Sequence, residues 1–326
     1  MEIGKLPPEL LEQLILNKLT NRREEVLVRS STGQDSTILT TNNKPIVLST
    51  DPITGEVANI GWFAIHVACN DVAANGAEPV GVLLTLLLPK GCNNKTIATI
   101  MNDASQAASE LNIDILGGHT ELTDAVNRPV ISTTALGIPL TETLVISAKV
   151  TGDLDIVLTK GAGIEGTAIL ANSGLKELND IDGKLLQKAK NHFKNLSVVP
   201  ESRIAVEIGV IAMHDVTEGG VLGALYEVAQ AGKCGFIIDY NKIPVLPETK
   251  ALCDVFNLDV LRLISSGSML IFTKYGDKLV KKLNENNIFA AIIGKTTDKQ
   301  EYLIDIDDKK QVVEPPESDE IWKVKL

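Results

Sequence analysis

The segment that most restricts how this chain can fold is residues 80–88, VGVLLTLLL, which holds no charged residue and lies between Pro79 and Pro89. A short apolar run with such boundaries is typical of a strand buried on both faces of a sheet. Apolar residues recur at helical spacing in residues 59–76 before it, and residues 96–111 after it also have a helical pattern. The sequence therefore predicts an α+β fold.

The length of the chain predicts two domains. Its 326 residues exceed the roughly 100 to 200 residues of an ordinary domain. The chain becomes polar at residues 147–153 before a new apolar strand at 156–159, so we expect domains at 1–150 and 151–326. In the second domain we expect helices at 182–193, 202–208, 221–231 and 277–286, and strands at 235–239, 269–273 and 290–294.

Composition argues against a nucleic-acid partner, a membrane and export. The net charge is −11, and no basic tract with interleaved aromatic residues is present. No apolar run approaches the roughly 20 residues that span a bilayer, and the acids Glu2, Glu9 and Glu12 lie where a secretory peptide is basic and then apolar. The four cysteines are scattered and form no Cys-x-x-Cys pair, which favours a reducing cytoplasm over a zinc site or a disulfide framework.

Four aspartates lie beside apolar runs that should be strands or helices. They are Asp35, Asp51, Asp71 and Asp215. Magnesium prefers oxygen ligands and is usually held by one or two carboxylates together with phosphate oxygens and water. Carboxylates delivered by several rigid elements meet this need, so the four together indicate a magnesium-nucleotide site. For each aspartate alone, a role as an ordinary cap or turn residue is the alternative.

Two glycine-rich segments suit contact with a phosphate. In residues 214–220, HDVTEGG, an acid, a hydroxyl and two glycines come at the expected start of a helix, where free backbone amides bind anions. Residues 161–166, GAGIEG, have the Gly-x-Gly-x-x-Gly spacing of a dinucleotide fingerprint, but a helical pattern follows where a second strand with an acidic end is required. A tight strand-to-helix connection is the simpler interpretation of this second segment, with a phosphate contact as the alternative.

Two histidines neighbour these motifs. His214 is more typical of a structural histidine bonded to a nearby turn than of a general base. His119 lies in residues 117–121, GGHTE, which we predict to be a polar glycine turn where small neighbours let a ligand approach. A structural role for His119 is equally open. The sequence has no serine-hydrolase elbow, Walker lysine loop or kinase motif.

The ordered set of motifs resembles the aminoimidazole ribonucleotide synthetase superfamily over nearly the whole chain. Each motif is modest alone, whereas their order is specific. The start at residues 4–7 and the helix with Asn70 and Asp71 look closest to the hydrogenase-maturation carbamoyl dehydratase branch. The matching segments are Asp35-Ser36, Ser49-Thr50-Asp51, residues 70–79 (NDVAANGAEP), residues 117–121, Lys160-Gly161 with residues 165–170, residues 214–220 and residues 265–270 (SSGSML).

The resemblance implies an N-terminal domain that forms a β-barrel across a homodimer, a C-terminal α+β domain, and magnesium-ATP in the cleft between them. It implies an ATP-dependent enzyme that activates a small carbonyl, amide or phosphate-bearing substrate, because phosphorylation makes an oxygen a better leaving group. It implies metal ligands at Asp35, Asp51, Asp71 and Asp215, catalytic roles for Asp51, His119 and Glu121, and nucleotide contacts at Asn70, Gly117, Gly118, Thr120, Lys160, Thr217 and Gly219.

The sequence departs from the family in three places. It ends IWKVKL, without the cysteine that carries the carboxamide in the carbamoyl dehydratase branch, which favours a diffusible substrate. Gln34 stands where relatives often carry a second acid, and His119 where several carry a carboxylate, so one metal is expected to bind differently or to be missing. A second hypothesis is therefore a nucleotide-binding regulatory or assembly protein of the same fold without turnover, or a hydrogenase-maturation-like factor.

Overall fold

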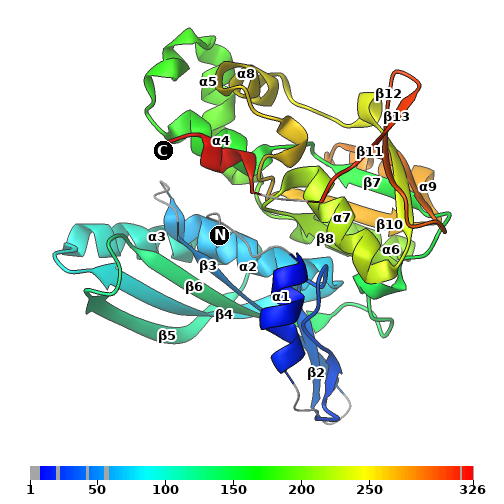
Figure 1. The fold of residues 1–326 in the computed structure, drawn as a ribbon. Coiled ribbons are helices and arrows are strands. Elements are labelled where there is room, and N and C mark those ends of the chain that lie inside the picture. The colour runs from blue at the N-terminus through cyan, green and yellow to red at the C-terminus, as the bar shows by residue number, and fades with distance from the viewer. Residues whose placement is uncertain (1–7, 20–22, 42–43, 55–58, 316–317, 326) are drawn as a thin grey trace.

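The computed structural model describes residues 8–19, 23–41, 44–54, 59–315 and 318–325. Figure 1 shows two units, one above the other, each with a sheet and helices packed on it. A short helix, α1 (Pro8–Leu14), precedes the first unit, and the C-terminal segment returns to the boundary between the two. The predicted α+β fold is confirmed by these two mixed sheets.

The first unit is built on a six-stranded sheet. Its strands are β1 (Val26–Val28), β2 (Thr37–Thr41), β3 (Lys44–Ile53), β4 (Ala77–Pro89), β5 (Asp114–Thr123) and β6 (Val130–Pro139). They lie in the order β1-β2-β3-β6-β4-β5, with β4 and β5 parallel and the other neighbours antiparallel. The sheet of the described residues is open in a single chain, so the barrel predicted across a homodimer is not closed within one chain and stays a prediction.

Two helices, α2 (Ile60–Ala74) and α3 (Asn94–Leu111), cover one face of this sheet (Figure 1). α3 buries one stripe that includes Ile100, Ala104 and Leu111, as expected for a helix with a solvent-exposed face. α2 differs because every one of its residues is buried. Its neighbours are the sheet, α3, and two elements of the second unit, α6 (Val199–Ile208) and β8 (Ala212–Val216). A helix enclosed in this way joins the two units.

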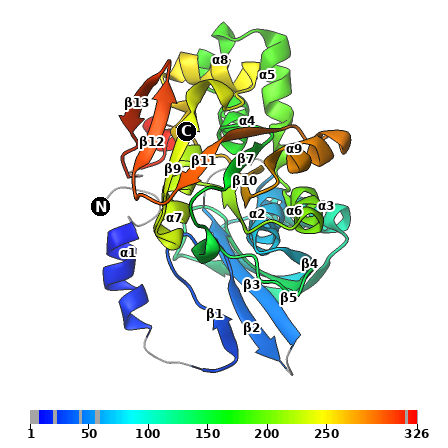
Figure 2. The same cartoon turned by 90° about the vertical axis from the view of Figure 1, so that its right-hand side faces the viewer.

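The second unit has a seven-stranded sheet in the order β13-β12-β9-β11-β7-β10-β8. The remaining strands are β7 (Asp155–Thr159), β9 (Gly235–Asp239), β10 (Ser268–Thr273), β11 (Ala290–Thr297), β12 (Tyr302–Ile306) and β13 (Lys309–Val312). Figure 2 shows β12 and β13 at one edge of this sheet. The remaining α-helices are α4 (Ile164–Asn172), α5 (Gly183–Lys190), α7 (Gly220–Gly232), α8 (Pro247–Phe256) and α9 (Gly276–Glu285), and a 3-10 helix, η7 (Glu320–Lys323), lies in the C-terminal segment.

The sequence predicted most of these elements and failed at one motif. The buried strand at residues 80–88 is confirmed within β4, and the helices at 59–76 and 96–111 are confirmed as α2 and α3. The turn predicted at residues 117–121 is wrong, because these residues belong to β5. Gly118 has φ of 145°, and a Cβ there would overlap the backbone of Leu84 in β4. This glycine therefore permits a close strand contact.

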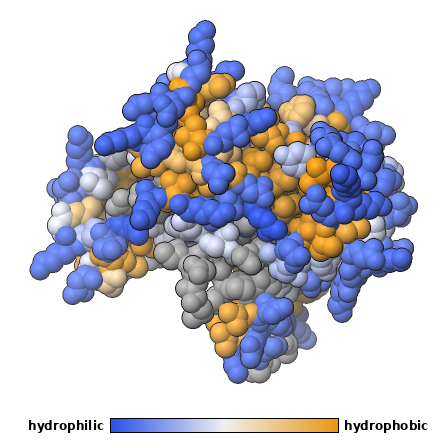
Figure 3. All heavy atoms as spheres, turned by 45° about the horizontal axis from the view of Figure 1, so that its top comes forward, coloured by the Kyte–Doolittle hydropathy of each residue, from blue (hydrophilic) through white to orange (hydrophobic). Residues whose placement is uncertain are grey.

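Charged and polar residues dominate the surface, and the exposed apolar residues are unevenly distributed. Figure 3 shows a face on which hydrophilic side chains surround smaller apolar patches. None of the described helices is long and apolar enough to cross a membrane. Large apolar side chains are exposed on β4, β5 and β6 of the first sheet, namely Val80, Leu83, Leu116, Leu122 and Ile138.

The contact between α2 and α3 provides a test of the packing. Gly61→Ala places a methyl group against the carbonyl oxygen of Ile100 in α3, so we expect the unfolding free energy to fall by about 1 to 3 kcal/mol. Gly183→Ala in α5 is the matched control, because its Cβ meets no atom within 4 Å and alanine favours a helix. Urea denaturation measures both variants. If Gly61→Ala is as stable as the parent, the described helix contact is wrong.

Candidate functional site

Asp51 and Asp71 meet where β3 packs against α2. Ser49 and Asp51 are two residues apart on β3, so their side chains point to the same face of the sheet. The Ser49 hydroxyl donates a hydrogen bond to the Asp71 carboxylate, which identifies this face as the one covered by α2. The Ser36 hydroxyl donates to the backbone oxygen of Asp71 over 2.8 Å. Strand and helix together fix the position of Asp71.

Asp35 and Asp215 add negative charge at the same place from two other segments. Asp215 lies on β8 of the second unit and is 2% exposed, while Asp35 lies just before β2 with its side chain 8% exposed. Burial raises the pKa of Asp71 well above its ordinary value, and repulsion from Asp51, Asp215 and Asp35 raises it further. Carboxylates from both units therefore interact around Asp71.

This donor set suits a magnesium ion that is bound together with phosphate. Carboxylate oxygens are the ligands that Mg²⁺ prefers, and a cation would relieve the repulsion that raises the pKa of Asp71. Within the described residues, no three His, Cys, Asp or Glu side chains form a ready metal cage. Mg²⁺ does not require one, because phosphate oxygens and water usually complete its coordination shell. Metal binding by the four aspartates stays a prediction.

His214 is held between two carboxylates. Its Nδ1 lies 2.5 Å from Asp35 Oδ1, and its Nε2 lies 3.2 Å from Glu227 Oε2 of α7. Burial alone lowers the pKa of the imidazole, but Asp35 and Glu227 together outweigh burial and raise the pKa of His214 to about 10. A histidine charged at neutral pH in an ion triad agrees with the structural role expected for it. Its charge also offsets part of the charge of Asp35.

The glycine turn after β8 holds a carboxylate of this same chain. Gly219 lies immediately before α7 with φ of 86°, a conformation that favours glycine. Its amide donates to Asp319 Oδ2 over 2.7 Å. Asp319 Oδ1 accepts from the amides of Ile264 and Ile321 over 3.1 and 2.8 Å. The amide that the sequence marks as an anion donor is thus bonded to an aspartate from the C-terminal segment.

Glu165 and Glu218 bring further negative charge to Asp319. Burial raises the pKa of Asp319 to about 6; its three amide hydrogen bonds oppose this rise, and Glu218 adds to it. Burial raises the pKa of Glu165 to about 7; hydrogen bonds from Ser266 oppose this rise, while Asp319 and Glu218 add to it. The two carboxyl groups whose pKa burial raises toward neutrality, Asp319 and Glu165, therefore lie close to the glycine turn.

Asn70 and Lys160, which the resemblance implies as nucleotide contacts, are bonded within the protein. The Asn70 side chain donates to the Leu196 carbonyl over 2.7 Å and accepts from the Val198 amide over 2.9 Å. Lys160 Nζ lies 2.7 Å from Glu201 Oε1 of α6. These bonds hold segments of the second unit in place, so a nucleotide contact for either side chain stays a prediction. Lys160 Nζ also donates to the carbonyl oxygens of Asn195, Ser197 and Gly267.

His119 and Glu121 lie on the outer edge of the first sheet, together with Gly117 and Thr120. β5 is an edge strand, and the side chains of His119 and Glu121 are 64% and 48% exposed, with 3.1 Å between His119 Nε2 and Glu121 Oε2. The sheet register leads from Asp51 across β6 and β4 to residue 118. Three strand spacings make this distance about 14 Å. One chain therefore does not bring these residues to the carboxylates.

The GAGIEG segment forms a tight connection between β7 and α4. The amide of Gly163 donates to Ser265 Oγ over 2.8 Å, and the amide of Ala162 donates to the Pro244 carbonyl over 2.9 Å. A Cβ on Gly166 would overlap the side chain of Leu263. The glycines thus serve close packing, in line with the simpler of the two interpretations.

Known protein families match the chain in two parts that correspond to the two sheets. Residues 33–139 match the AIR synthase related protein N-terminal domain, and residues 152–306 match the AIR synthase related protein C-terminal domain. The chain belongs to the AIR synthase-related family. The resemblance that rested on the order of the motifs is confirmed.

Individual AIR synthase-related proteins resemble the chain over most of its length. A Methanocaldococcus jannaschii protein named for hydrogenase expression and formation is 27% identical over 98% of this chain and 97% of its own. The carbamoyl dehydratase HypE of Escherichia coli is 27% identical over 77% of this chain and 74% of its own. Two solved structures share the fold: a HypE–HypF complex, with a TM-score of 0.80 and 21% identity over 94% of this chain and 99% of that one, and HypE in complex with ATP, with 0.76 and 20% over 96% and 95%.

The sequence analysis did not identify three acids near the site of this AIR synthase-related chain. Glu227 and Asp319 lie outside every glycine-flanked motif, so nothing local indicates that they contact His214 and Gly219. Glu165 lies inside the GAGIEG segment, and an acid among packed glycines was an available signal. These contacts depend on tertiary structure, which brings together residues distant in sequence.

Glu165 gives a stability test with a defined pH dependence. Its folded pKa of about 7 exceeds the ordinary value of 4.5, so its stabilising contribution is complete below pH 4.5 and is lost as the pH rises through about 7. Glu165→Gln should therefore match the parent near pH 4.5, and at pH 8 its unfolding free energy should exceed that of the parent by roughly 3 kcal/mol. Denaturation at several pH values measures this difference. A difference that does not change with pH would show that the pKa of Glu165 is the same in the folded and unfolded protein, which would contradict the rise in the folded protein.

Proposed function

We propose that this protein is an ATP-dependent enzyme that activates a small carbonyl, amide or phosphate-bearing substrate by phosphoryl transfer. The observation that carries the proposal is the electrostatic coupling of Asp71 to Asp51, Asp215 and Asp35, which come from both units. Protein carboxylates that repel one another in a buried place lower stability unless a cation joins them. A magnesium-phosphate complex is the ligand that such a set suits best.

The carboxylates would act by positioning and by charge. Asp51 and Asp71 would hold the metal, because both lie at the packed junction of β3 and α2. Asp215 would hold it from the second unit, so that closure of the two units and metal binding depend on each other. Bound Mg²⁺ would neutralise charge on the transferred phosphoryl group. The Gly219 amide would donate a hydrogen bond to the phosphates once they displace the Asp319 carboxylate from it.

Relatives support ATP as the nucleotide and leave the acceptor undefined. One solved structure of HypE contains ATP, and HypE of Escherichia coli is a carbamoyl dehydratase. The buried thiols of Cys69 and Cys253 are unsuited to act as the acceptor. Burial raises the pKa of both to about 12, and thiolate is the reactive form. We therefore propose that the phosphoryl group goes to a separate small molecule.

A second candidate function is a nucleotide-binding regulatory or assembly protein, including a hydrogenase-maturation-like factor. The bond between Asp319 and the Gly219 amide favours it, because a carboxylate already occupies the anion donor. A solved complex of HypE with HypF supports assembly as a role of relatives. Binding of ATP without phosphate release across a set of carbonyl and amide substrates would favour this candidate, and turnover of one substrate would eliminate it.

Binding of magnesium-ATP is the direct test of the proposed function. At about 100 times its dissociation constant a ligand stabilises the folded state by about 2.7 kcal/mol, so millimolar magnesium-ATP should raise the melting temperature by several degrees. Asp51→Asn should abolish the shift. Asp305→Asn should retain it, because β12 lies far from β8 in the second sheet. The proposal would be contradicted if magnesium-ATP did not change the melting temperature of the parent. It would also be contradicted if the Asp51→Asn variant showed the full shift in melting temperature.

We also infer that the protein is a homodimer joined through the first sheet. β5 is an edge strand whose backbone is available for pairing, and Leu116 and Leu122 on it are 55% and 61% exposed. Exposed apolar residues on one sheet are typical of an interface. Pairing of two such sheets would produce the barrel that a single chain lacks.

Sedimentation tests the dimer. The parent should sediment at about twice the 35.0 kDa of one chain. Leu122→Glu should shift it to a monomer, because a charge at the buried centre of an interface is costly. Val312→Glu is the matched control, since Val312 is 65% exposed on β13 of the other unit and should leave the dimer intact. A parent that sediments as a monomer would contradict the inference.

A further inference from the structure

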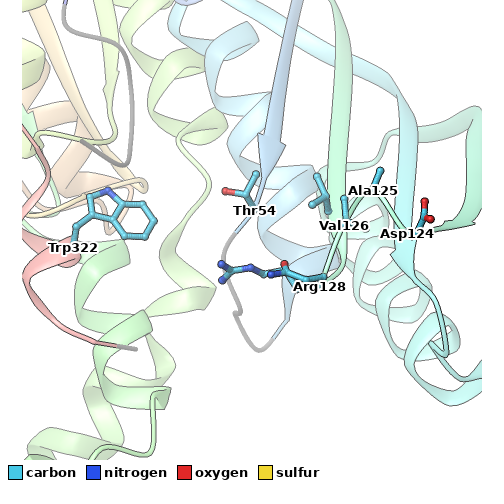
Figure 4. A pocket seen from close by; sticks show the side chains of 8 residues that line it. Thr54, Asp124, Ala125, Val126, Arg128 and Trp322 are labelled. Carbon is cyan, nitrogen blue, oxygen red and sulfur yellow. The ribbon is translucent and has the colours of Figure 1, made fainter. Parts of the chain in front are cut away.

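A cavity of about 500 Å³ lies between the first unit and the C-terminal segment. Its walls include Thr54 after β3, Asn127 and Arg128 in the loop before β6, and Trp322 on η7. The volume is within the range of about 300 to 1,000 Å³ that is typical of sites for small molecules. Figure 4 shows that the loop and Trp322 face this space from different parts of the fold. The cavity therefore exists only when the C-terminal segment is in place.

Two short connections link this cavity to the carboxylates. Thr54 comes three residues after Asp51, which is about 10 Å along an extended chain. Trp322 comes three residues after Asp319, which binds the Gly219 amide at the turn that follows Asp215. Both walls of the cavity thus continue directly from segments that carry the acidic site. A molecule bound in it would lie beside the proposed phosphoryl donor.

Arg128 supplies an available positive charge in this cavity. In the part of the chain that the structure describes, it is the arginine that makes no ion pair or hydrogen bond with the protein. Figure 4 shows its guanidinium extending toward the side of Trp322, while Asp124, a carboxylate that also lines the cavity, lies at the other end of the same loop. A guanidinium binds carboxylate or phosphate through two parallel hydrogen bonds. In a chain of net charge −11, such a group offsets the repulsion that an anionic substrate meets near the aspartates.

Trp322 supplies a flat apolar wall on a segment that is anchored to the second unit. Its side chain remains 40% exposed although the residue before it, Ile321, is 3% exposed in the core. The start of η7 is fixed by Asp319 and by Glu320, whose Oε2 accepts from the Asp259 amide over 3.0 Å. These bonds fix the backbone that carries Trp322, and its exposed indole ring offers a flat face for a planar ligand.

We propose that this cavity is the acceptor site, and that it takes a small planar compound carrying a carboxylate or phosphate group. Arg128 binds the anionic group, Trp322 stacks on the planar body, and Thr54 and Asn127, which also line the cavity, offer hydrogen bonds. The assignment rests on the proposed function for the direction of phosphoryl transfer. The binding of the anion does not depend on it, because Arg128 and Trp322 lie outside the aspartate cluster.

Calorimetric titration without nucleotide tests the site, using phenyl phosphate, benzoate and the neutral phenol as probes. We expect phenyl phosphate or benzoate to bind and phenol to bind at least about tenfold more weakly; the stronger anion identifies the acceptor's charged group. Arg128→Gln should weaken anion binding at least about tenfold, and Trp322→Ala at least about fivefold. Arg23→Gln is the matched control, because Arg23 pairs with Glu25 away from the cavity and its loss should change nothing.

Magnesium-ATP melting shifts of the same variants separate the two proposals. Arg128→Gln should keep the full shift and the melting temperature of the parent, since its side chain is exposed and unpaired in the described chain. If magnesium-ATP stabilises the parent but neither anion binds, the acceptor site is wrong and the proposed function stands. If the anions bind but magnesium-ATP has no effect, the site stands and the proposed function falls. Equal binding of phenol and benzoate, or unchanged binding by Arg128→Gln, would overturn the assignment of Arg128.

Discussion

The complete burial of α2 is the constraint on which the rest of the structure depends. An isolated amphipathic helix needs one partner surface, but α2 needs a partner on every side because each of its residues is buried. The first sheet and α3 cover part of it, and α6 and β8 of the second unit cover the remainder. Polar groups inside α2 then require partners from that second unit, and Asn70 finds them at Leu196 and Val198. The two units must therefore dock for the polar groups of α2 to find their hydrogen-bond partners.

The same burial creates the acidic site and the electrostatic repulsion among its carboxylates. Asp71 is carried into the interior by α2, where it meets Asp51 from the first sheet and Asp215 from the second. A hydrogen bond from Ser49 and the charged His214 beside Asp35 offset part of the repulsion. A bound cation would relieve the repulsion that remains and so stabilise the folded protein. Packing alone does not favour such an arrangement, and proteins retain similar arrangements where function needs them.

The parts of this fold that follow from local sequence could be predicted, and those that depend on tertiary contacts could not. Apolar spacing identified α2 and β4 because burial on all sides leaves an unbroken apolar pattern. The glycines of β5 misled the prediction, since Gly118 is required by the backbone of Leu84 more than 30 residues earlier and not by a turn. The aspartates were identifiable from their positions at element ends, whereas the partner of Gly219 came from the distant C-terminal segment.

The C-terminal segment connects the two halves of the proposed chemistry. Asp319 bonds to the Gly219 amide, and Trp322, one turn further on, forms a wall of the cavity that contains Arg128. A phosphate that takes the Gly219 amide removes one of the three amide bonds of Asp319 and leaves those to Ile264 and Ile321. The loss of one bond in three weakens the anchor without releasing it, so nucleotide and acceptor would influence each other through η7. Burial raises the pKa of Asp319 to about 6, so its carboxylate is ionised only above about that pH. The influence of nucleotide and acceptor on each other, which acts through the bonds of this carboxylate, would therefore be strongest above about pH 6.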